Sequence, residues 1–306
     1  MIDGIINIYK EPGYTSHDVV AKLRGILRQK KIGHTGTLDP AAEGVLPVCL
    51  GKGTRLCELL TDKVKTYRAV LLLGVETDTQ DTTGRILEER KTDGISEDEI
   101  RRVAGGFVGT YMQIPPMYSA IKVNGKKLYE LAREGKEISR EARPVEIYDL
   151  VLEKTELPRV EMTVTCSKGT YIRTLCHDIG ERLGCGGCME HLKRIRVGRF
   201  DISESLTLAQ VQQLKEEGNL EKWILPVDEV FAECPGLVSD NENLDRLIRN
   251  GNPFSAAFYP MRSACKTEGP EGWLRVYDSR NEFIGIYEYR SDRKQWKPKK
   301  IFLGGE

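Results

Sequence analysis

The chain has 306 residues, 40% of them hydrophobic and 30% charged, which is enough for about two domains that bury a real core. Its 46 lysines and arginines balance 46 aspartates and glutamates, so a uniformly basic surface is excluded and a polyanionic partner must meet local clusters of charge. The longest apolar stretch, residues 69–75, is far shorter than the roughly 20 residues of a membrane span, so we expect no span.

The N-terminal residues are predicted to form a strand and then a helix. β-branched residues recur in residues 4–10, and Ser16 is predicted to cap a helix whose apolar positions run from Val19 to Leu27 at helical spacing. Residues 31–53 contain five glycines and two prolines. This segment therefore cannot be one regular element.

Strand and helix patterns alternate through the middle of the chain. Ser96 and Glu99 predict a capping box, and Asn124-Gly125 is typical of a two-residue hairpin turn. Strands are expected at residues 66–73, 145–153, 160–166 and 191–200, and helices at residues 56–60, 172–183 and 208–214.

The pattern changes after about residue 226. Helical periodicity weakens, and two short strands at residues 274–277 and 283–289 are separated by turn residues. We therefore expect an α+β domain over residues 1–228, with a mixed, mostly antiparallel sheet and flanking helices. A small β-rich domain is expected over residues 229–306.

Motifs for a nucleotide or metal cofactor are incomplete. Residues 51–54 resemble the end of a phosphate-binding P-loop, but Leu46 stands where that motif requires glycine. Cys185 and Cys188 form one CxxC pair, whereas a zinc site usually draws its four ligands from two such pairs. We expect no cofactor and no metal, and a zinc-dependent nucleic-acid-binding protein is the weaker alternative.

The cysteines and the N-terminus indicate the compartment. Eight cysteines in a chain of this length are too sparse for a secreted disulfide framework. The first residues lack the basic and apolar segments of a signal peptide. Both features favour a cytoplasmic protein with reduced thiols.

A glycine-punctuated loop is a candidate for chemistry. Gly33 and Gly36 permit tight turns and the close approach of a ligand to the backbone. Pro40 keeps Asp39 out of the helical region. A carboxylate on such a loop is well placed to act on a substrate, although Asp-Pro is also a common turn, so these residues alone leave a structural role open.

Positive charge gathers in four clusters that are interleaved with aromatic residues. The clusters are Lys63, Lys65 and Arg68; Lys168 and Arg173; Lys193, Arg194, Arg196 and Arg199; and Arg290, Arg293, Lys294, Lys297, Lys299 and Lys300. Any one of them is compatible with a solvated face. Together with Tyr67, Tyr171 and Trp296 they favour structured or flipped RNA as the partner, because RNA is bound by phosphate contacts and aromatic stacking.

The loop also carries a family resemblance. Its motif Gly33-His34-Thr35-Gly36-x-Leu38-Asp39-Pro40 resembles that of the TruB family of tRNA pseudouridine synthases. Further matching motifs are Lys10-x-Pro12-x-x-x-Ser16, Lys65-x-Tyr67, Thr77-Asp78-Thr79 with Asp81, Pro115-x-Met117-Tyr118-Ser119-Ala120, Gly125-Lys126-Lys127-Leu128-Tyr129, Arg140-x-x-Arg143-Pro144 and Ser167-Lys168-Gly169-Thr170-Tyr171-Ile172-Arg173. The C-terminal segment is similar, less distinctly, to the small PUA-like domain of that family.

The resemblance implies roles for individual residues. Asp39 falls on the family's essential aspartate and Arg173 on the arginine that pairs with it. Tyr67 falls on an active-site tyrosine that stacks on the target base, and Tyr171 on a residue of the uracil pocket. We predict an ion pair between Asp39 and Arg173, with charged atoms within about 4 Å. Tyr67 is one candidate to relay the proton that leaves C5 of the base.

Three further residues are implied in substrate binding. His34 matches a histidine that helps to displace the uridine from its stack. Leu192 falls on an apolar pocket residue, although residues 188–191 before it depart from the family pattern. Lys10, in the first of the matching motifs, is expected in the same group.

The resemblance implies a pseudouridine-synthase-type fold and an isomerase that acts on uridine 55 in the T-arm of tRNA. The N-glycosidic bond breaks, the uracil turns, and C1′ bonds to C5, with no net redox change and no group supplied. The uridine must be flipped out of its folded loop, and a carboxylate can stabilise or trap the electron-poor sugar. We expect a monomer. The alternative is a non-catalytic tRNA-binding or tRNA-folding module on the same scaffold.

Overall fold

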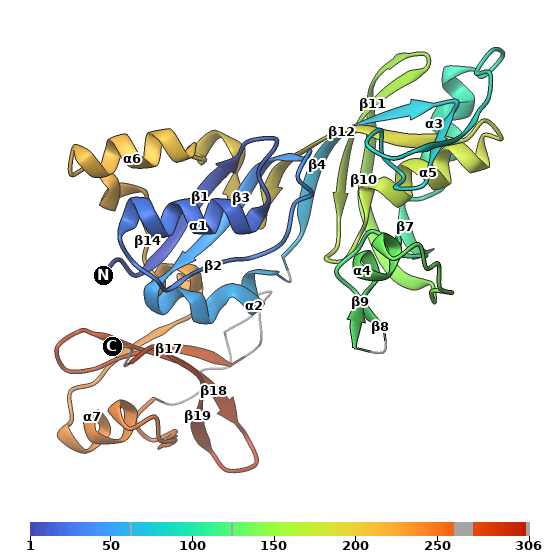
Figure 1. Cartoon of the computed structure of the whole chain (residues 1–306). Helices are drawn as coiled ribbons and strands as arrows, with labels where there is room; N and C mark the ends of the chain where they lie inside the picture. The colour runs from blue at the N-terminus through green and yellow to red at the C-terminus, as the bar shows by residue number, and fades with distance from the viewer. Residues whose placement is uncertain (62, 124, 260–271, 304–306) are drawn as a thin grey trace.

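The computed structural model describes residues 1–61, 63–123, 125–259 and 272–303. A large sheet crosses the upper part of the molecule, and a smaller sheet near the C-terminus lies below it (Figure 1). The predicted α+β fold, with a mixed and mostly antiparallel sheet, is confirmed. Among the described residues, no helix combines the length and the apolar character that crossing a membrane requires.

The large sheet has the strand order β14-β1-β3-β12-β4-β11-β10-β7, with β2 paired to β3 and β13 paired to β12. Its strands are β1 (Gly4–Lys10), β2 (Ile32–His34), β3 (Glu43–Leu50), β4 (Lys65–Leu73), β7 (Gly109–Gln113), β10 (Arg143–Glu156), β11 (Arg159–Cys166), β12 (Gly187–Val197), β13 (Phe200–Asp201) and β14 (Ile224–Leu225). All of these pairs are antiparallel except β3 with β12. The parallel pair sets Arg194 opposite Gly44, so β12 reaches the segment that leads into β3.

Helices cover the two halves of this sheet separately (Figure 1). Apolar residues of α1 and α6 pack with β1 and β3, whereas those of α3 and α5 pack with β4 and β11. The helices are α1 (Ser16–Leu27), α2 (Cys57–Thr61), α3 (Glu97–Gly105), α4 (Leu128–Arg133), α5 (Ile172–Arg182), α6 (Leu208–Glu216) and α7 (Glu242–Arg249), with 3-10 helices η1 (Gly51–Leu56), η2 (Ile202–Glu204), η3 (Leu220–Trp223) and η4 (Asp228–Phe231).

Helix α1 is capped by a different residue from the one predicted. The N-cap is Thr15, whose side chain accepts from the Asp18 N–H while the Asp18 carboxylate accepts from the Thr15 N–H. Ser16 is buried in the first turn, and its hydroxyl accepts from the Leu38 N–H at 3.0 Å. The predicted cap at Ser16 is wrong because that hydroxyl holds the loop before Asp39.

Two local predictions are met in modified form. The hairpin expected at Asn124-Gly125 exists as β8 (Lys122–Val123) and β9 (Lys126–Lys127), with Asn124 itself outside the described residues. Ser96 caps α3 by accepting from the Glu99 N–H, which is one half of the predicted capping box. A further pair, β5 (Val75–Thr77) with β6 (Ile86–Glu89), forms the hairpin around residues 77–84.

Strand β12 begins earlier than residue 191. Gly187 pairs with Leu73 of β4, so the strand already includes Cys188. Glycine disfavours strands by itself, and the residues before 191 therefore carry no strand signal. Pairing with β4 extends the strand through them.

The smaller sheet has the order β15-β17-β18-β19-β16. Its strands are β15 (Gly236–Val238), β16 (Phe254–Ser255), β17 (Trp273–Tyr277), β18 (Phe283–Arg290) and β19 (Gln295–Ile301). Helix α7 was not predicted. Leu244 and Ile248 of this helix enter the core and Leu247 packs against it, so an apolar i, i+3, i+4 pattern follows the Asn241 cap in a region where only strands were predicted.

The two sheets share one apolar cluster. Ile5 and Val45 of the large sheet belong to it together with Ile286 and Phe302 of the C-terminal part. The Arg55 guanidinium, in η1, also donates to main-chain carbonyls at the end of β19 and beyond it. The C-terminal sheet is therefore packed against the rest of the protein.

Candidate active site

The segment between β2 and β3 carries Asp39 and is held by backbone bonds. The Leu38 N–H donates to the Ser16 hydroxyl at 3.0 Å, and the Gly13 N–H donates to the Pro40 carbonyl at 2.9 Å. These bonds tie both neighbours of Asp39 to the end of β1 and the start of α1. The carboxylate is thus held in place although its segment has no regular structure.

The predicted ion pair between Asp39 and Arg173 is confirmed. Nε of Arg173 lies 3.0 Å from Oδ2 of Asp39, and Nη2 lies 3.4 Å from Oδ1. The Arg173 side chain is 6% exposed and that of Asp39 is 39% exposed, so the guanidinium is enclosed while the carboxylate remains accessible. Carbonyls of Thr79 and Tyr118 accept from the guanidinium at 3.1 and 2.8 Å, and a carboxylate oxygen of Asp81 lies 3.7 Å away.

The protonation of Asp39 depends on opposing influences. Burial is the largest influence and raises the pKa of its carboxyl group, and the charge of Asp81 raises it further. The positive charges of Arg173 and Lys10 lower the pKa. The result is a pKa above the ordinary aspartate value. Because a guanidinium is permanently charged, Arg173 favours the ionised carboxylate throughout the physiological range.

A cavity of about 440 Å³ opens at Asp39. Tyr67, Tyr171, Leu192 and Arg173 also line it, so the structure brings together five of the seven predicted site residues. Aromatic and apolar walls around one carboxylate–guanidinium pair suit a flat, uncharged heterocycle with an attached sugar.

The two tyrosines come from different elements. Tyr67 lies on β4, and burial raises its pKa to about 12, so the phenol keeps its proton at neutral pH and cannot accept another. Tyr171 is the N-cap of α5, and burial raises the pKa of its phenol as well. The buried amide of Gln113 accepts from the Tyr171 N–H at 2.8 Å and donates to the Tyr171 carbonyl at 3.0 Å, which fixes the start of α5.

Lys10 lies beneath the loop and does not line the cavity. Its ammonium is fully buried and donates to the carbonyls of Glu11, Pro40 and Ala42. Burial lowers the pKa of Lys10 to about 8. This geometry supports the segment that carries Asp39, whereas the sequence predicted a contact with the substrate.

His34 ends β2 and is half-buried outside the cavity lining. Its ring meets the His17 ring edge-on at 5.2 Å between centroids, and its Nδ1 accepts from the Gly36 N–H at 3.3 Å. Burial, aided by the charges of His17 and Arg194, lowers the pKa of His34. The imidazole is therefore neutral at pH 7, with its hydrogen on Nε2.

Two family matches cover most of the chain. Residues 24–172 match the family described as TruB family pseudouridylate synthase (N terminal domain), and residues 173–232 match the tRNA pseudouridylate synthase B C-terminal domain. The chain belongs to the TruB family.

Similar TruB proteins align over almost the full length. A protein named tRNA pseudouridine synthase B from Lachnoclostridium phytofermentans is 50% identical over 310 residues, which cover 99% of this chain and 100% of that protein. Another from Clostridium perfringens strain 13 is 43% identical over 303 residues, with 99% of each chain covered. A chain of a solved Cbf5-Nop10-Gar1 complex has a TM-score of 0.69 and 27% identity, over 98% of this chain and 85% of that one.

Three polar residues at this TruB site were given no role by the sequence. Asp81 contacts Arg173, Gln113 fixes Tyr171, and Arg194 lines the cavity. Asp81 stood within a matching motif and Arg194 within a basic cluster, but only the packed structure shows which groups they contact. Gln113 ends a short strand, and its one available signal was a polar residue between apolar neighbours.

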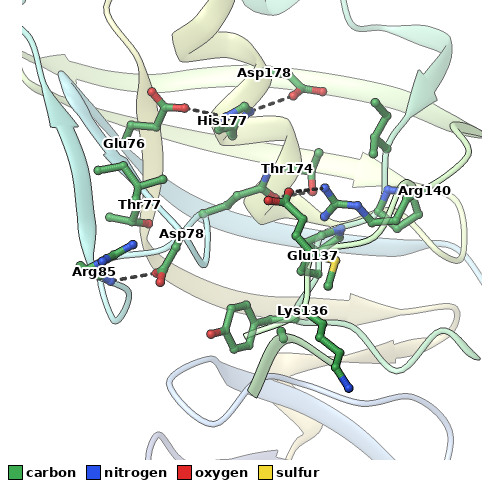
Figure 2. A pocket seen from close by; sticks show the side chains of 18 of the residues that line it. Glu76, Thr77, Asp78, Arg85, Lys136, Glu137, Arg140, Thr174, His177 and Asp178 are labelled. Atoms are coloured by element: carbon green, nitrogen blue, oxygen red, sulfur yellow. Dashed lines mark hydrogen bonds and ion pairs between the residues drawn. The ribbon is translucent and has the colours of Figure 1, made fainter. Parts of the chain in front are cut away.

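A second cavity, of about 550 Å³, shares Tyr118 with the first, and Figure 2 shows the polar side chains around it, among them His177 and Arg140. Its ionic groups neutralise one another: His177 lies between Glu76 and Asp178, at 3.3 and 3.1 Å, and Arg140 pairs with Glu137 at 3.3 Å. Although this cavity is larger, its Arg140 is 21% exposed and pairs with a Glu137 that is 79% exposed, whereas Arg173 is 6% exposed and holds Asp39 between two tyrosines. The smaller cavity is therefore the candidate site.

Possible metal ligands gather beside this second cavity. Among the described residues, ligand atoms of Glu76, His177 and Glu181 lie within 4.8 Å of one another. The guanidinium of Arg90 already pairs with Glu76 at 3.6 Å and with Glu181 at 3.2 Å, so a cation occupies this position. The Cys185 thiol is buried, donates to the Gly186 carbonyl at 3.2 Å and is not part of this group.

Proposed function

We propose that this protein isomerises uridine in tRNA to pseudouridine, and that uridine 55 of the T-arm is its target. Its membership of the TruB family supports the reaction class. The single observation that carries the proposal is the accessible carboxylate of Asp39, held 3.0 Å from an enclosed Arg173 inside a cavity with two tyrosines.

The chemistry follows from the charge that develops on the sugar. As the N-glycosidic bond breaks, C1′ becomes electron-poor, and Asp39 acts on the sugar as the nucleophile at C1′ or as the base that removes a sugar proton. Arg173 keeps the carboxylate ionised for either role. A primary isotope effect on the rate with a deuterated ribose identifies the proton-removal route, and its absence with trapping of a sugar–Asp39 ester identifies the nucleophilic route.

The base needs a pocket that excludes water, because water would otherwise capture the sugar. Tyr67 keeps its hydroxyl proton and offers the face of its ring for stacking, while Tyr171 and Leu192 complete the walls of the pocket. His34, neutral and outside the pocket, is placed to occupy the gap that the flipped uridine leaves in the RNA stack.

Two further proposals concern the C-terminal residues and the state of the whole protein. We propose that residues 229–306 form a PUA-like unit whose Lys297, Lys299 and Lys300 meet the acceptor side of tRNA. We also propose that the protein acts as a monomer in the cytoplasm, where thiols such as those of Cys176 and Cys188 stay reduced.

The decisive test uses Asp39→Asn, which is nearly isosteric but cannot be ionised. Wild-type protein is incubated with unmodified tRNA and a chelator, without any cofactor, and pseudouridine is measured by mass spectrometry of the digested RNA. We expect conversion at position 55 by the wild type and a loss of at least about 10⁴-fold in the variant, since the group that acts on C1′ is gone.

Affinity of Asp39→Asn for tRNA, measured by filter binding, should stay close to that of the wild type. An inactive wild-type protein that still binds tRNA would favour the non-catalytic module instead. Full turnover by the variant would remove Asp39 from the reaction.

A further inference from the structure

A second arginine lies at the cavity, on β12. Arg194 is 1% exposed, and its guanidinium lines the cavity that holds Asp39. Nε donates to the Val45 carbonyl at 2.7 Å, while Nη1 and Nη2 reach the carbonyls of Thr37 and Gly36 at 3.5 and 3.4 Å. It therefore spans the segment that carries Asp39, from residues before it to a residue after it.

The two arginines of the cavity differ in how their charge is compensated. Arg173 has two carboxylates, Asp39 and Asp81, within 4 Å. Arg194 forms no ion pair with any carboxylate in the part of the chain that the structure describes, and its guanidinium donates to main-chain carbonyls. Carbonyl dipoles reduce the cost of burying a guanidinium but do not cancel its charge. A net positive charge thus remains at the cavity wall.

The proposed reaction needs such a charge at one stage. When the C1′–N1 bond breaks, its electron pair leaves with the base, which becomes a uracil anion with charge spread over N1 and both carbonyl oxygens. The turned anion then gives an electron pair from C5 to C1′, and the C5 proton passes to a base while N1 takes up a proton, which gives the neutral product. Because the anion is absent from both substrate and product, a fixed cation beside it lowers the barrier without tightening the binding of either.

We propose that Arg194 is the cation that stabilises the departing uracil, an inference that rests on the proposed function. A base stacked on Tyr67 lies beside Arg194, because the two residues are paired across β4 and β12 and both line the cavity. Arg173 cannot supply this charge equally well because two carboxylates neutralise it. The bonds from Arg194 to the Asp39 segment give it a second, bracing role, and an experiment must separate the two.

Two substitutions separate charge from bracing. Arg194→Lys keeps the charge and loses the planar fork, whereas Arg194→Met loses both at similar volume. With enzyme in excess over a T-arm stem-loop, we expect the rate constant of pseudouridine formation to fall by about 10²–10³ for Arg194→Met and by less than about tenfold for Arg194→Lys, with RNA affinity within about threefold. Arg101→Met, which removes an exposed arginine of α3 that pairs with Glu97 at 2.6 Å and belongs to none of the basic clusters, is the control and should react like the wild type.

Equal losses in Arg194→Lys and Arg194→Met would overturn the proposal and leave Arg194 as a brace. An inactive wild type would contradict the proposed function instead, so the two failures are distinguishable.

A second measurement covers the case in which Arg194→Met does not fold. The target uridine is replaced by 2-thiouridine, whose base is the better leaving anion. In Arg194→Gln, which loses the charge but keeps an amide that can bond the main-chain carbonyls, the ratio of the thio rate to the oxo rate should exceed the wild-type ratio, because the base must then stabilise more of its own charge. A ratio equal to that of the wild type would overturn the proposal, since a purely structural defect slows both substrates alike.

Discussion

The carboxyl group of Asp39 titrates under the influence of the groups around it, and this has a measurable consequence. Its pKa is raised by burial and lowered by Arg173 and by the ammonium of Lys10. Since only the ionised form acts on the sugar, activity should fall as the pH drops through a midpoint above the ordinary aspartate value. Lys10→Met removes one cation, so the midpoint should move to still higher pH.

This shift is measured as the acid limb of the single-turnover rate against pH. Lys22→Met, which removes an exposed ammonium from α1, is the control and should leave the midpoint unchanged. An identical limb in the wild type and Lys10→Met would show that Lys10 does not act on Asp39 electrostatically.

The same residues mark what sequence can and cannot reveal about the site. The loop motif and the family resemblance were enough to pair Asp39 with Arg173 and to place Tyr67, Tyr171 and Leu192 around them. Lys10 was named for substrate binding because it stands in a matching motif, and that motif indicated nothing about its burial. Only the packing of its strand under the loop turns that ammonium toward three carbonyls.

The junction of β3 and β12 depends on one glycine. Gly44 has a φ of +107°, and a Cβ at this position would lie 2.2 Å from the Arg194 carbonyl oxygen, so neither strand can accommodate a side chain. We expect Gly44→Ala to lower the free energy of unfolding by at least about 2 kcal/mol, measured by urea denaturation.

Gly94→Ala is the matched control for Gly44→Ala. Gly94 has a φ of +91° with nothing within 4 Å of the added Cβ, so its cost is backbone strain alone, about 1 kcal/mol. Equal losses in the two variants would contradict the proposed clash at β3 and β12.

Elements with strong periodicity were predicted well, and those that depend on distant partners were not. The spacing from Val19 to Leu27 identified α1, because apolar residues repeated at helical spacing over several turns share one face only in a helix. The first residues of β12 carry little local signal and are stabilised by pairing with β4, whereas α7 was not predicted although Leu244, Leu247 and Ile248 have helical spacing. The cap of α1 was misassigned by one residue because Thr15 and Ser16 are chemically equivalent until the loop at Leu38 selects between them.

The apolar cluster shared by the two sheets should make the protein unfold as one unit. Phe302 is fully buried in this cluster, so Phe302→Ala removes contacts from both parts at once. We expect a single calorimetric transition in the wild type, and in the variant a single transition at lower temperature, with a loss of about 3–5 kcal/mol. Two separated transitions in the wild type would contradict this coupling.

That shared cluster also bears on how a large substrate is held. Arg55 and the buried side chains join the C-terminal strands to the sheet that carries Asp39 without a flexible linker between the packed surfaces. The distance from the Asp39 cavity to the lysines of β19 is then fixed. A polynucleotide that touches both points must present them at that one spacing, and lengthening its stem by a few base pairs would free one contact whenever the other is made.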